Sequence, residues 1–226
     1  MLKSGKDKGS YVVDKILYDT EKYMFKSIVS NWLDMGDLHK LHEIRQYKHF
    51  DREHDQSTQW HKMFYTMIRI DKTFSKVYVN FLTDIIKPRF NEEIVYQKIP
   101  TFRIHLPGNV SVGEFHKDKD YRNKDWAEKV REVNYYLPLT KAYGTNTIWA
   151  ESKEDKGDFK SIDSGYGECV EWEASKLTHG NKDNVTSITR VSMDFRIIPK
   201  SRYIESNHLT INTKVPFGVG GYYEVL

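Results

Sequence analysis

The stretch GEFHKDKDY, residues 113–121, places an imidazole and a carboxylate, His116 and Asp118, two positions apart. In an extended strand, residues i and i+2 leave the same face, so both side chains could reach one ion while Lys117 faces away. A site with two histidines and one carboxylate binds a first-row metal and leaves positions open for substrate and oxygen. The pair therefore predicts part of a metal site, if a second histidine completes it.

His179 is the histidine best placed to do so. It follows a strand-like run and precedes a glycine in the segment LTHGNKDNV. Several of the nine histidines instead lie in helical or charged segments that favour a solvated surface: His39, His42, His49, His54 and His61.

The segment RVSMDFRI, residues 190–197, alternates between polar and apolar side chains. Because alternate residues of a strand share a face, the four polar side chains lie opposite the apolar ones. The polar set is Arg190, Ser192, Asp194 and Arg196, and the apolar set includes Val191, Met193 and Phe195. A polar inward face indicates a strand that lines a polar cavity.

These pieces together resemble the iron(II)/2-oxoglutarate-dependent oxygenases. Their pattern is HxD, a distal His and an Arg about ten to thirteen residues later, at times as RxS. Here HKD is followed by His179, sixty-one residues after Asp118, and then by RVS eleven residues further on. The text NTIWAESKEDKGDF and HGNKDNVTSITRVSMDFRIIP is similar to the oxygenases grouped with the streptomycin-biosynthesis protein StrG. The resemblance spans roughly residues 100–200.

The resemblance implies a double-stranded β-helix, a cupin-like jelly roll, in which His116, Asp118 and His179 hold Fe(II) as the catalytic centre. It implies 2-oxoglutarate as cosubstrate, with its far carboxylate paired to Arg190 and hydrogen-bonded by Ser192. The reaction would hydroxylate a C–H bond of a small polar metabolite, such as a sugar, aminocyclitol or amino-acid derivative, using O2 and releasing succinate and CO2. A carboxylate at position 118 argues against halogenation and leaves desaturation and cyclisation open.

Further positions are candidate ligand contacts. Asn134 and Tyr136 alternate on EVNYYLP, which the resemblance places near the cosubstrate, and we expect one of them to contact it. Four residues are candidate substrate contacts: Arg103 and His105 on TFRIHL, and Lys117 and Arg122 near the metal.

Arg196 is the rival anchor for 2-oxoglutarate. It lies six residues beyond Arg190 on the same face, or about 20 Å at roughly 3.3 Å per residue. We therefore expect Arg196 near the other end of the barrel, paired with Asp194 or another acid.

Two regions of the chain differ in their residue patterns, and the difference suggests how these residues are positioned. Residues 11–35 and 73–90 carry apolar side chains at helical spacing, and Pro88 closes the second segment. From residue 95 onward, short strand-like runs alternate with Gly and Asn turns: TFRIHL, REVNYYLPLT, NTIWAES, ECVEWEA, SITRVSMDFRIIP and GYYEVL. The prediction is one α+β domain over residues 1–226, with 1–94 mainly helical support and 95–226 the β-helix core.

Composition sets outer limits on function. The 226 residues include 30% charged side chains with a net charge of +3, which gives no electrostatic reason to expect a nucleic-acid or membrane partner. One cysteine and no signal-like or membrane-length apolar run lead us to expect a cytoplasmic protein. Two alternatives remain: a non-redox cupin-like protein, such as a sugar epimerase or carbohydrate-binding module, and a protein side-chain hydroxylase.

Overall fold

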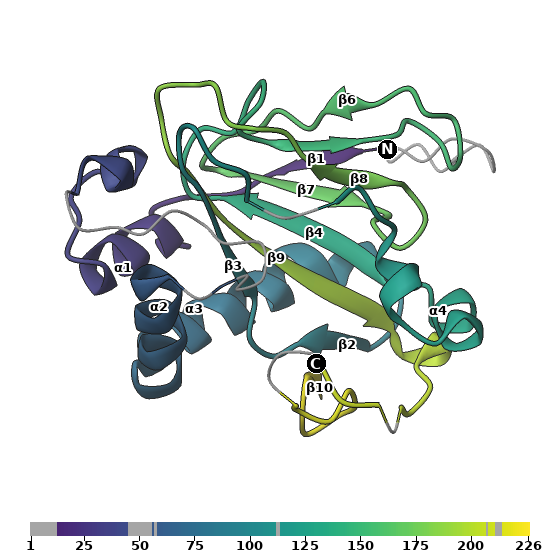
Figure 1. Cartoon of the computed structure of the whole chain (residues 1–226). Helices are drawn as coiled ribbons and strands as arrows, with labels where there is room; N and C mark the ends of the chain where they lie inside the picture. The colour runs from purple at the N-terminus through teal and green to yellow at the C-terminus, as the bar shows by residue number, and fades with distance from the viewer. Residues whose placement is uncertain (1–12, 45–55, 57, 112–113, 207, 211–213) are drawn as a thin grey trace, which may run out of the picture.

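The computed structural model describes residues 13–44, 56, 58–111, 114–206, 208–210 and 214–226. Its centre is a seven-stranded antiparallel sheet in the order β1-β7-β4-β9-β2-β10, with β3 also paired to β9 (Figure 1). The strands are β1 (Asp14–Leu17), β2 (Ile94–Gln97), β3 (Thr101–His105), β4 (Val133–Pro138), β7 (Glu168–Trp172), β9 (Arg190–Pro199) and β10 (Tyr223–Val225). A smaller antiparallel sheet, β6-β5-β8, contains β5 (Ile148–Ala150), β6 (Lys160–Ser161) and β8 (His179–Asn181). The architecture combines helices with antiparallel sheets, as predicted.

Strand β9 organises the large sheet. It pairs with β4 along one edge, and with β3 and β2 along the other. Its apolar side chains are buried in the main hydrophobic core: Val191, Met193, Phe195 and Ile197. Its four polar side chains line a cavity on the opposite face. The alternation predicted from the sequence is therefore confirmed.

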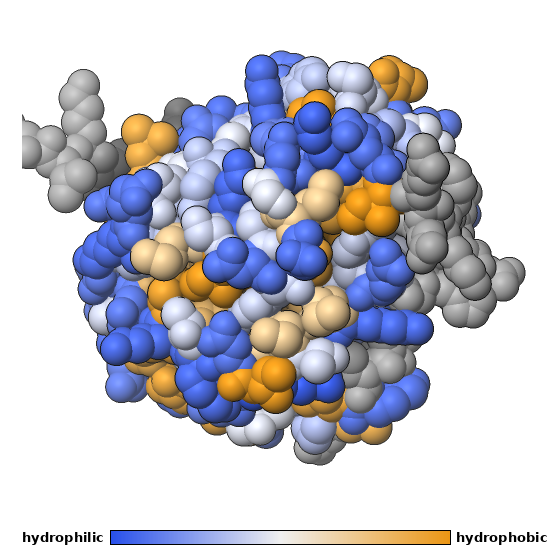
Figure 2. Space-filling view, turned by 90° about the vertical axis from the view of Figure 1, so that its left-hand side faces the viewer, coloured by the Kyte–Doolittle hydropathy of each residue, from blue (hydrophilic) through white to orange (hydrophobic). Residues whose placement is uncertain are grey.

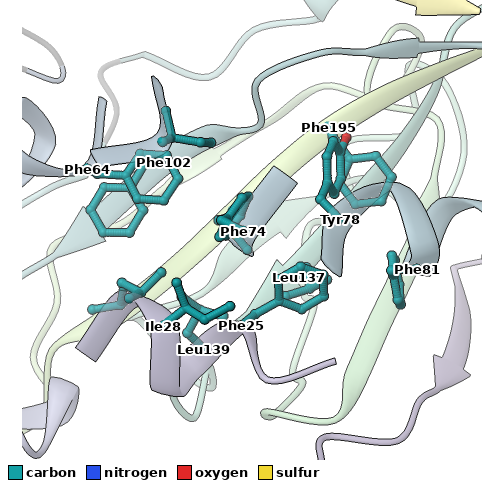
Figure 3. Close-up of a cluster of buried hydrophobic side chains, with 14 of the residues drawn as sticks. Phe25, Ile28, Phe64, Phe74, Tyr78, Phe81, Phe102, Leu137, Leu139 and Phe195 are labelled. Carbon is teal, nitrogen blue, oxygen red and sulfur yellow. The ribbon is translucent and has the colours of Figure 1, made fainter. Parts of the chain in front are cut away.

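Three helices cover the apolar face: α1 (Phe25–Trp32), α2 (Gln59–Ile70) and α3 (Lys72–Phe81). The side chains of Thr58 and Asp71 cap the backbone at the starts of α2 and α3, which helps to fix where these helices begin. Figure 3 shows Phe64 of α2 stacked on Phe102 of β3, with ring centroids 4.2 Å apart. This aromatic core holds β3 and β9 in place, and with them the polar residues on their other face.

One expectation about the helices needs correction. Residues 14–17, predicted as helix, form strand β1, which pairs with β7 from Asp14↔Glu171 to Leu17↔Glu168. The β-branched Ile16 suits a strand, and pairing with β7 overrides the helical spacing. The predicted second helix is confirmed: α3 continues through a π-turn, Leu82–Ile86, into a 3₁₀ turn that contains Pro88. Helix α4 (Lys124–Val130) was not predicted, and Val12 lies outside the described residues.

Of the histidines assigned to a solvated surface, two are partly buried and one is buried. His39 and His42 lie partly buried on a 3₁₀ turn, Leu38–Glu43, and His42 Nδ1 is 2.9 Å from Thr189 Oγ1. His61 is buried. His49 and His54 lie outside the described residues.

The face in Figure 2 is largely hydrophilic, with scattered hydrophobic residues between charged ones. None of the helices in the described part of the chain is long and apolar enough to cross a bilayer.

Candidate metal centre

The backbone brings His116, Asp118 and His179 together although they come from distant parts of the chain. His116 and His179 form an antiparallel bridge in which each N–H donates to the other's carbonyl at 2.9 Å. Lys117 is extended, and Asp118 then opens a 3₁₀ turn, Asp118–Tyr121, rather than continuing a strand. One ligand atom from each of the three side chains lies within 4.8 Å of the others. The three predicted ligands therefore form a cluster.

Backbone carbonyls orient both imidazoles. The Nδ1 of His116 lies 2.9 Å from the Glu114 carbonyl, and that of His179 lies 2.9 Å from the Leu177 carbonyl. A carbonyl can only accept, so each Nδ1 carries the proton, and in the neutral ring the Nε2 lone pair is free. The two Nε2 atoms lie 3.6 and 3.7 Å from Asp118 Oδ1. Three donor atoms therefore converge on one point.

The second oxygen of Asp118 is held by other side chains. Oδ2 accepts from Arg196 Nη2 at 2.7 Å, from Arg196 Nε at 3.2 Å and from Asn134 Nδ2 at 3.1 Å. Burial opposes ionisation of Asp118, but nearby positive charge, that of Arg196 foremost, outweighs it and holds its pKa well below the usual range. Asp118 is thus an ionised carboxylate that presents Oδ1 to the histidines.

This contact corrects the expected position of Arg196. The residue pairs with an acid, as predicted, but that acid is Asp118 and not a group remote from the metal ligands. Its guanidinium also donates to Tyr222 Oη at 2.9 Å and lies 4.0 Å from both Glu132 and Asp194. The HKD segment folds back onto the end of β9 that carries Arg196.

The candidate substrate residues are placed differently. Arg103 lines the cavity, with its Nε 3.4 Å from Asp194 Oδ1. Lys117 reaches Asp155 at 2.5 Å, and Arg122 reaches Glu132 at 3.1 Å, so both side chains engage acids outside the cavity lining.

His105 also lies outside that lining. Its ring is fully buried between the Asn146 and Asn109 carbonyls, 3.1 and 2.8 Å from its two nitrogens. Burial, with the nearby Arg190 charge, lowers its pKa to about 3, although the hydrogen bonds to the two carbonyls favour the protonated ring.

Arg190 occupies another part of the same cavity wall. Its side chain is buried, and it donates through Nε to the Asn146 carbonyl at 3.0 Å and through Nη1 to Ser192 Oγ at 2.9 Å. No ion pair joins it to a carboxylate among the residues the structure describes. Burial lowers the pKa of Arg190, with a smaller opposing contribution from Tyr136. A buried guanidinium with only neutral partners is costly unless an anion joins it.

The cavity is about 580 Å³ including its open mouth. Three of its lining side chains carry a buried polar atom with no hydrogen-bond partner in the described part of the protein: Asn134 Oδ1, Tyr136 Oη and Trp172 Nε1. Sequence reasoning missed Trp172. Its alternation with Val170 and Ala174 in ECVEWEA was visible, but only the pairing with β4 shows which face meets the cavity.

Comparisons with known proteins find a sequence relative and several similar solved structures. No family model matches the chain. The streptomycin biosynthesis protein StrG of Streptomyces griseus is 36% identical over 212 residues, covering 94% of this chain and 98% of StrG. Among solved structures, EctD from S. alaskensis with bound Fe gives a TM-score of 0.50 at 12% identity, over 88% of this chain and 76% of that chain. CytC3 with Fe(II) and alpha-ketoglutarate gives 0.49 at 10% identity, over 84% and 73%. At such identities the EctD likeness shows a shared fold.

Proposed function

The chain belongs to the family of the streptomycin biosynthesis protein StrG, and from this premise we propose that it is an Fe(II)- and 2-oxoglutarate-dependent dioxygenase that hydroxylates a small polar metabolite. In this proposal the two sheets are the halves of a double-stranded β-helix, and the cavity between them is the active site. The proposal rests on one observation: the wall of a single cavity holds both the three-ligand cluster and a buried Arg190 that has no carboxylate partner among the described residues.

The donor set fits Fe(II). Two imidazoles with free Nε2 lone pairs and one ionised carboxylate oxygen are the ligand types of non-haem iron oxygenases, in which other positions stay open. The Fe in the EctD structure, whose fold is shared, supports the same choice of metal here.

The opposite part of the wall fits a dianionic cosubstrate. Arg190 can pair bidentately with the far carboxylate of 2-oxoglutarate and remain charged when buried. Ser192 Oγ already accepts from Arg190, so its own hydroxyl proton is available to that carboxylate. Tyr136 Oη is buried without a partner in the described structure, whereas Asn134 donates to Asp118. We therefore assign Tyr136, rather than Asn134, to 2-oxoglutarate.

When bound, Fe(II) with 2-oxoglutarate and O2 supplies an oxidative decarboxylation that converts R–H to R–OH and releases succinate and CO2. The protein's part is to hold and orient. The His116–His179 bridge fixes both imidazoles, Arg196 fixes Asp118, and Arg190 fixes the cosubstrate. The carboxylate of Asp118 occupies a ligand position, which favours hydroxylation over halogenation.

The proposal is tested by succinate formation from 2-oxoglutarate with Fe(II) and air, with small polyols and amino-acid derivatives as added substrates. We expect iron-dependent succinate release that is abolished in His179→Ala. Intact iron binding without succinate would favour a non-redox cupin-like protein instead.

A further inference from the structure

Trp172 and Asn134 face each other across neighbouring strands beside the metal cluster. They are paired in register on β7 and β4, and both line the cavity. The two residues are only 5% and 4% exposed. Trp172 Nε1 and Asn134 Oδ1 are nevertheless without a hydrogen-bond partner within the described chain. A buried polar atom left unpaired costs about 1–3 kcal/mol, so each atom calls for a hydrogen-bond partner.

Neighbouring contacts fix both atoms in place. Asn134 Nδ2 donates to Asp118 Oδ2, and a carboxylate oxygen requires a donor, so the amide oxygen of Asn134 must be the free atom. The Trp172 indole packs edge-on against the His179 ring, with centroids 4.8 Å apart at 84°. The wall therefore offers one rigid donor and one rigid acceptor close to two of the metal ligands.

The chemistry of this pair selects the group that binds it. Trp172 Nε1 can only donate and Asn134 Oδ1 can only accept. A single hydroxyl satisfies both, whereas a ketone or carboxylate cannot donate and an ammonium cannot accept.

The charge on the cavity wall disfavours a cationic group. Three arginines, Arg103, Arg190 and Arg196, face two aspartates, Asp118 and Asp194, and Fe(II) with dianionic 2-oxoglutarate adds no net charge. A cationic amine would therefore gain little there.

We propose that Trp172 and Asn134 form a hydroxyl-binding subsite, and that the substrate is a small molecule that places a neutral hydroxyl between them. The assignment rests on the proposed function, which supplies the neighbouring metal and cosubstrate.

The test uses the indole N–H signals in nitrogen-15 NMR spectra of the full chain, loaded with diamagnetic Zn(II) and 2-oxoglutarate. The chain has five tryptophans, and Trp172→Phe identifies one signal by removing it. The probes are three rings that differ in one group: cyclohexanol, cyclohexanone and cyclohexylamine. Cyclohexanol should move the Trp172 signal saturably and cyclohexylamine should not.

Asn134→Leu gives the decisive comparison. Loss of one hydrogen bond should weaken cyclohexanol binding about five-fold, while cyclohexanone, which only accepts, should bind as before. Unchanged cyclohexanone binding also shows that the variant is folded. If the Trp172 signal does not move when cyclohexanol is added, the pair holds water only. If Asn134→Leu weakens the binding of cyclohexanol and cyclohexanone equally, the role of Asn134 is structural. Either result overturns the subsite.

The outcome can be separated from that of the proposed function. Titrations of Zn(II) and 2-oxoglutarate are followed in the same samples, and the cyclohexanol titration is repeated on the metal-free protein. Normal metal and 2-oxoglutarate binding without a cyclohexanol shift counts against the subsite alone. Absent 2-oxoglutarate binding with an intact cyclohexanol shift counts against the proposed function.

Discussion

Arg190 and Arg196 share one face of β9, and their partners give them different tasks. Arg196 donates twice to Asp118, whereas Arg190 donates to a carbonyl and a hydroxyl and to no acid among the residues the structure describes. The buried Arg196 charge is balanced by Asp118, and the proposed function would balance the buried Arg190 charge with the far carboxylate of 2-oxoglutarate. Spacing along the strand led us to expect an acid partner for Arg196 and not for Arg190, but that this acid is Asp118 depends on where the HKD segment folds.

Arg190→Met should weaken 2-oxoglutarate binding about 10- to 100-fold, since charged hydrogen bonds contribute about 1.5–3 kcal/mol. The metal-free, ligand-free protein should be at least as stable as wild type, because the variant removes a buried cation that lacks an acid. Calorimetric titration and urea unfolding measure the two effects. Arg103→Met is the matched control, because that arginine of the same cavity already contacts Asp194. Equal losses in both variants would contradict the assignment.

Arg196→Met should weaken metal binding about 10- to 100-fold, the usual effect of removing a group that orients a ligand. Asp118 would lose two donors and the charge that keeps its pKa low. The metal affinity of Arg196→Lys should lie between those of wild type and Arg196→Met, since an ammonium restores the charge without the bidentate geometry. Metal titration against a competing chelator measures the affinities. Wild-type affinity in Arg196→Met would show that Asp118 needs no such support.

His105 should make folding sensitive to acid. Its pKa is about 3 in the folded chain, against an ordinary value of about 6.5 when unfolded. Between these two pKa values only the unfolded state binds the proton. The free energy of unfolding therefore decreases by about 1.4 kcal/mol for each unit by which the pH is lowered. The effect is absent above the unfolded pKa. Urea unfolding at about pH 7 and about pH 5 should therefore show a larger loss in wild type than in His105→Gln. Equal losses would mean that the buried ring does not stay neutral.

At the scale of elements, β9 joins the aromatic core to the site. Phe195 lies in the core, stacked on Tyr135 with centroids 5.1 Å apart, while the residues on either side of it line the cavity. The strand can serve both because its side chains alternate. Strands with this alternation were predictable from sequence: β3, β4, β7 and β9 all lie within the expected runs.

Phe195→Ala should lower the free energy of unfolding by about 3–5 kcal/mol, as expected for a large buried aromatic. Metal affinity of the folded variant should stay near that of wild type, because Phe195 faces away from the ligands. Leu17→Ala, whose side chain is 76% exposed, is the control and should change stability little. Chemical denaturation and metal titration check both quantities. A stable Phe195→Ala variant would contradict the role of the aromatic core.

Elements without a local pattern were not predictable. β1 becomes a strand because β7 offers it an edge, and Asp118 opens a turn where the spacing suggested a continued strand. Nothing in the sequence of either segment specifies its partner. In each case a contact far along the chain overrides the local preference.

At the scale of the whole molecule, the site draws on segments that are distant in sequence. The resemblance to the iron(II)/2-oxoglutarate-dependent oxygenases predicted His116, Asp118 and His179 together, and the structure clusters them. Trp172 and the Asp118–Arg196 pair could not be predicted from the sequence. Both depend on the packing of β7 and of the HKD turn, which sequence periodicity does not encode. The 36% identity with StrG extends over 94% of the chain, so the kinship includes the helical layer as well as the strands.

The most direct test of the central claim is an anaerobic titration of the full protein with Fe(II) and 2-oxoglutarate, followed by visible absorption. A weak charge-transfer band should appear only when both are present, and it should be lost in His179→Ala and reduced in Arg190→Met at the same concentrations. Such a band means that 2-oxoglutarate chelates iron held by His116, Asp118 and His179. A folded protein that binds iron but gives no band with 2-oxoglutarate would contradict the dioxygenase assignment.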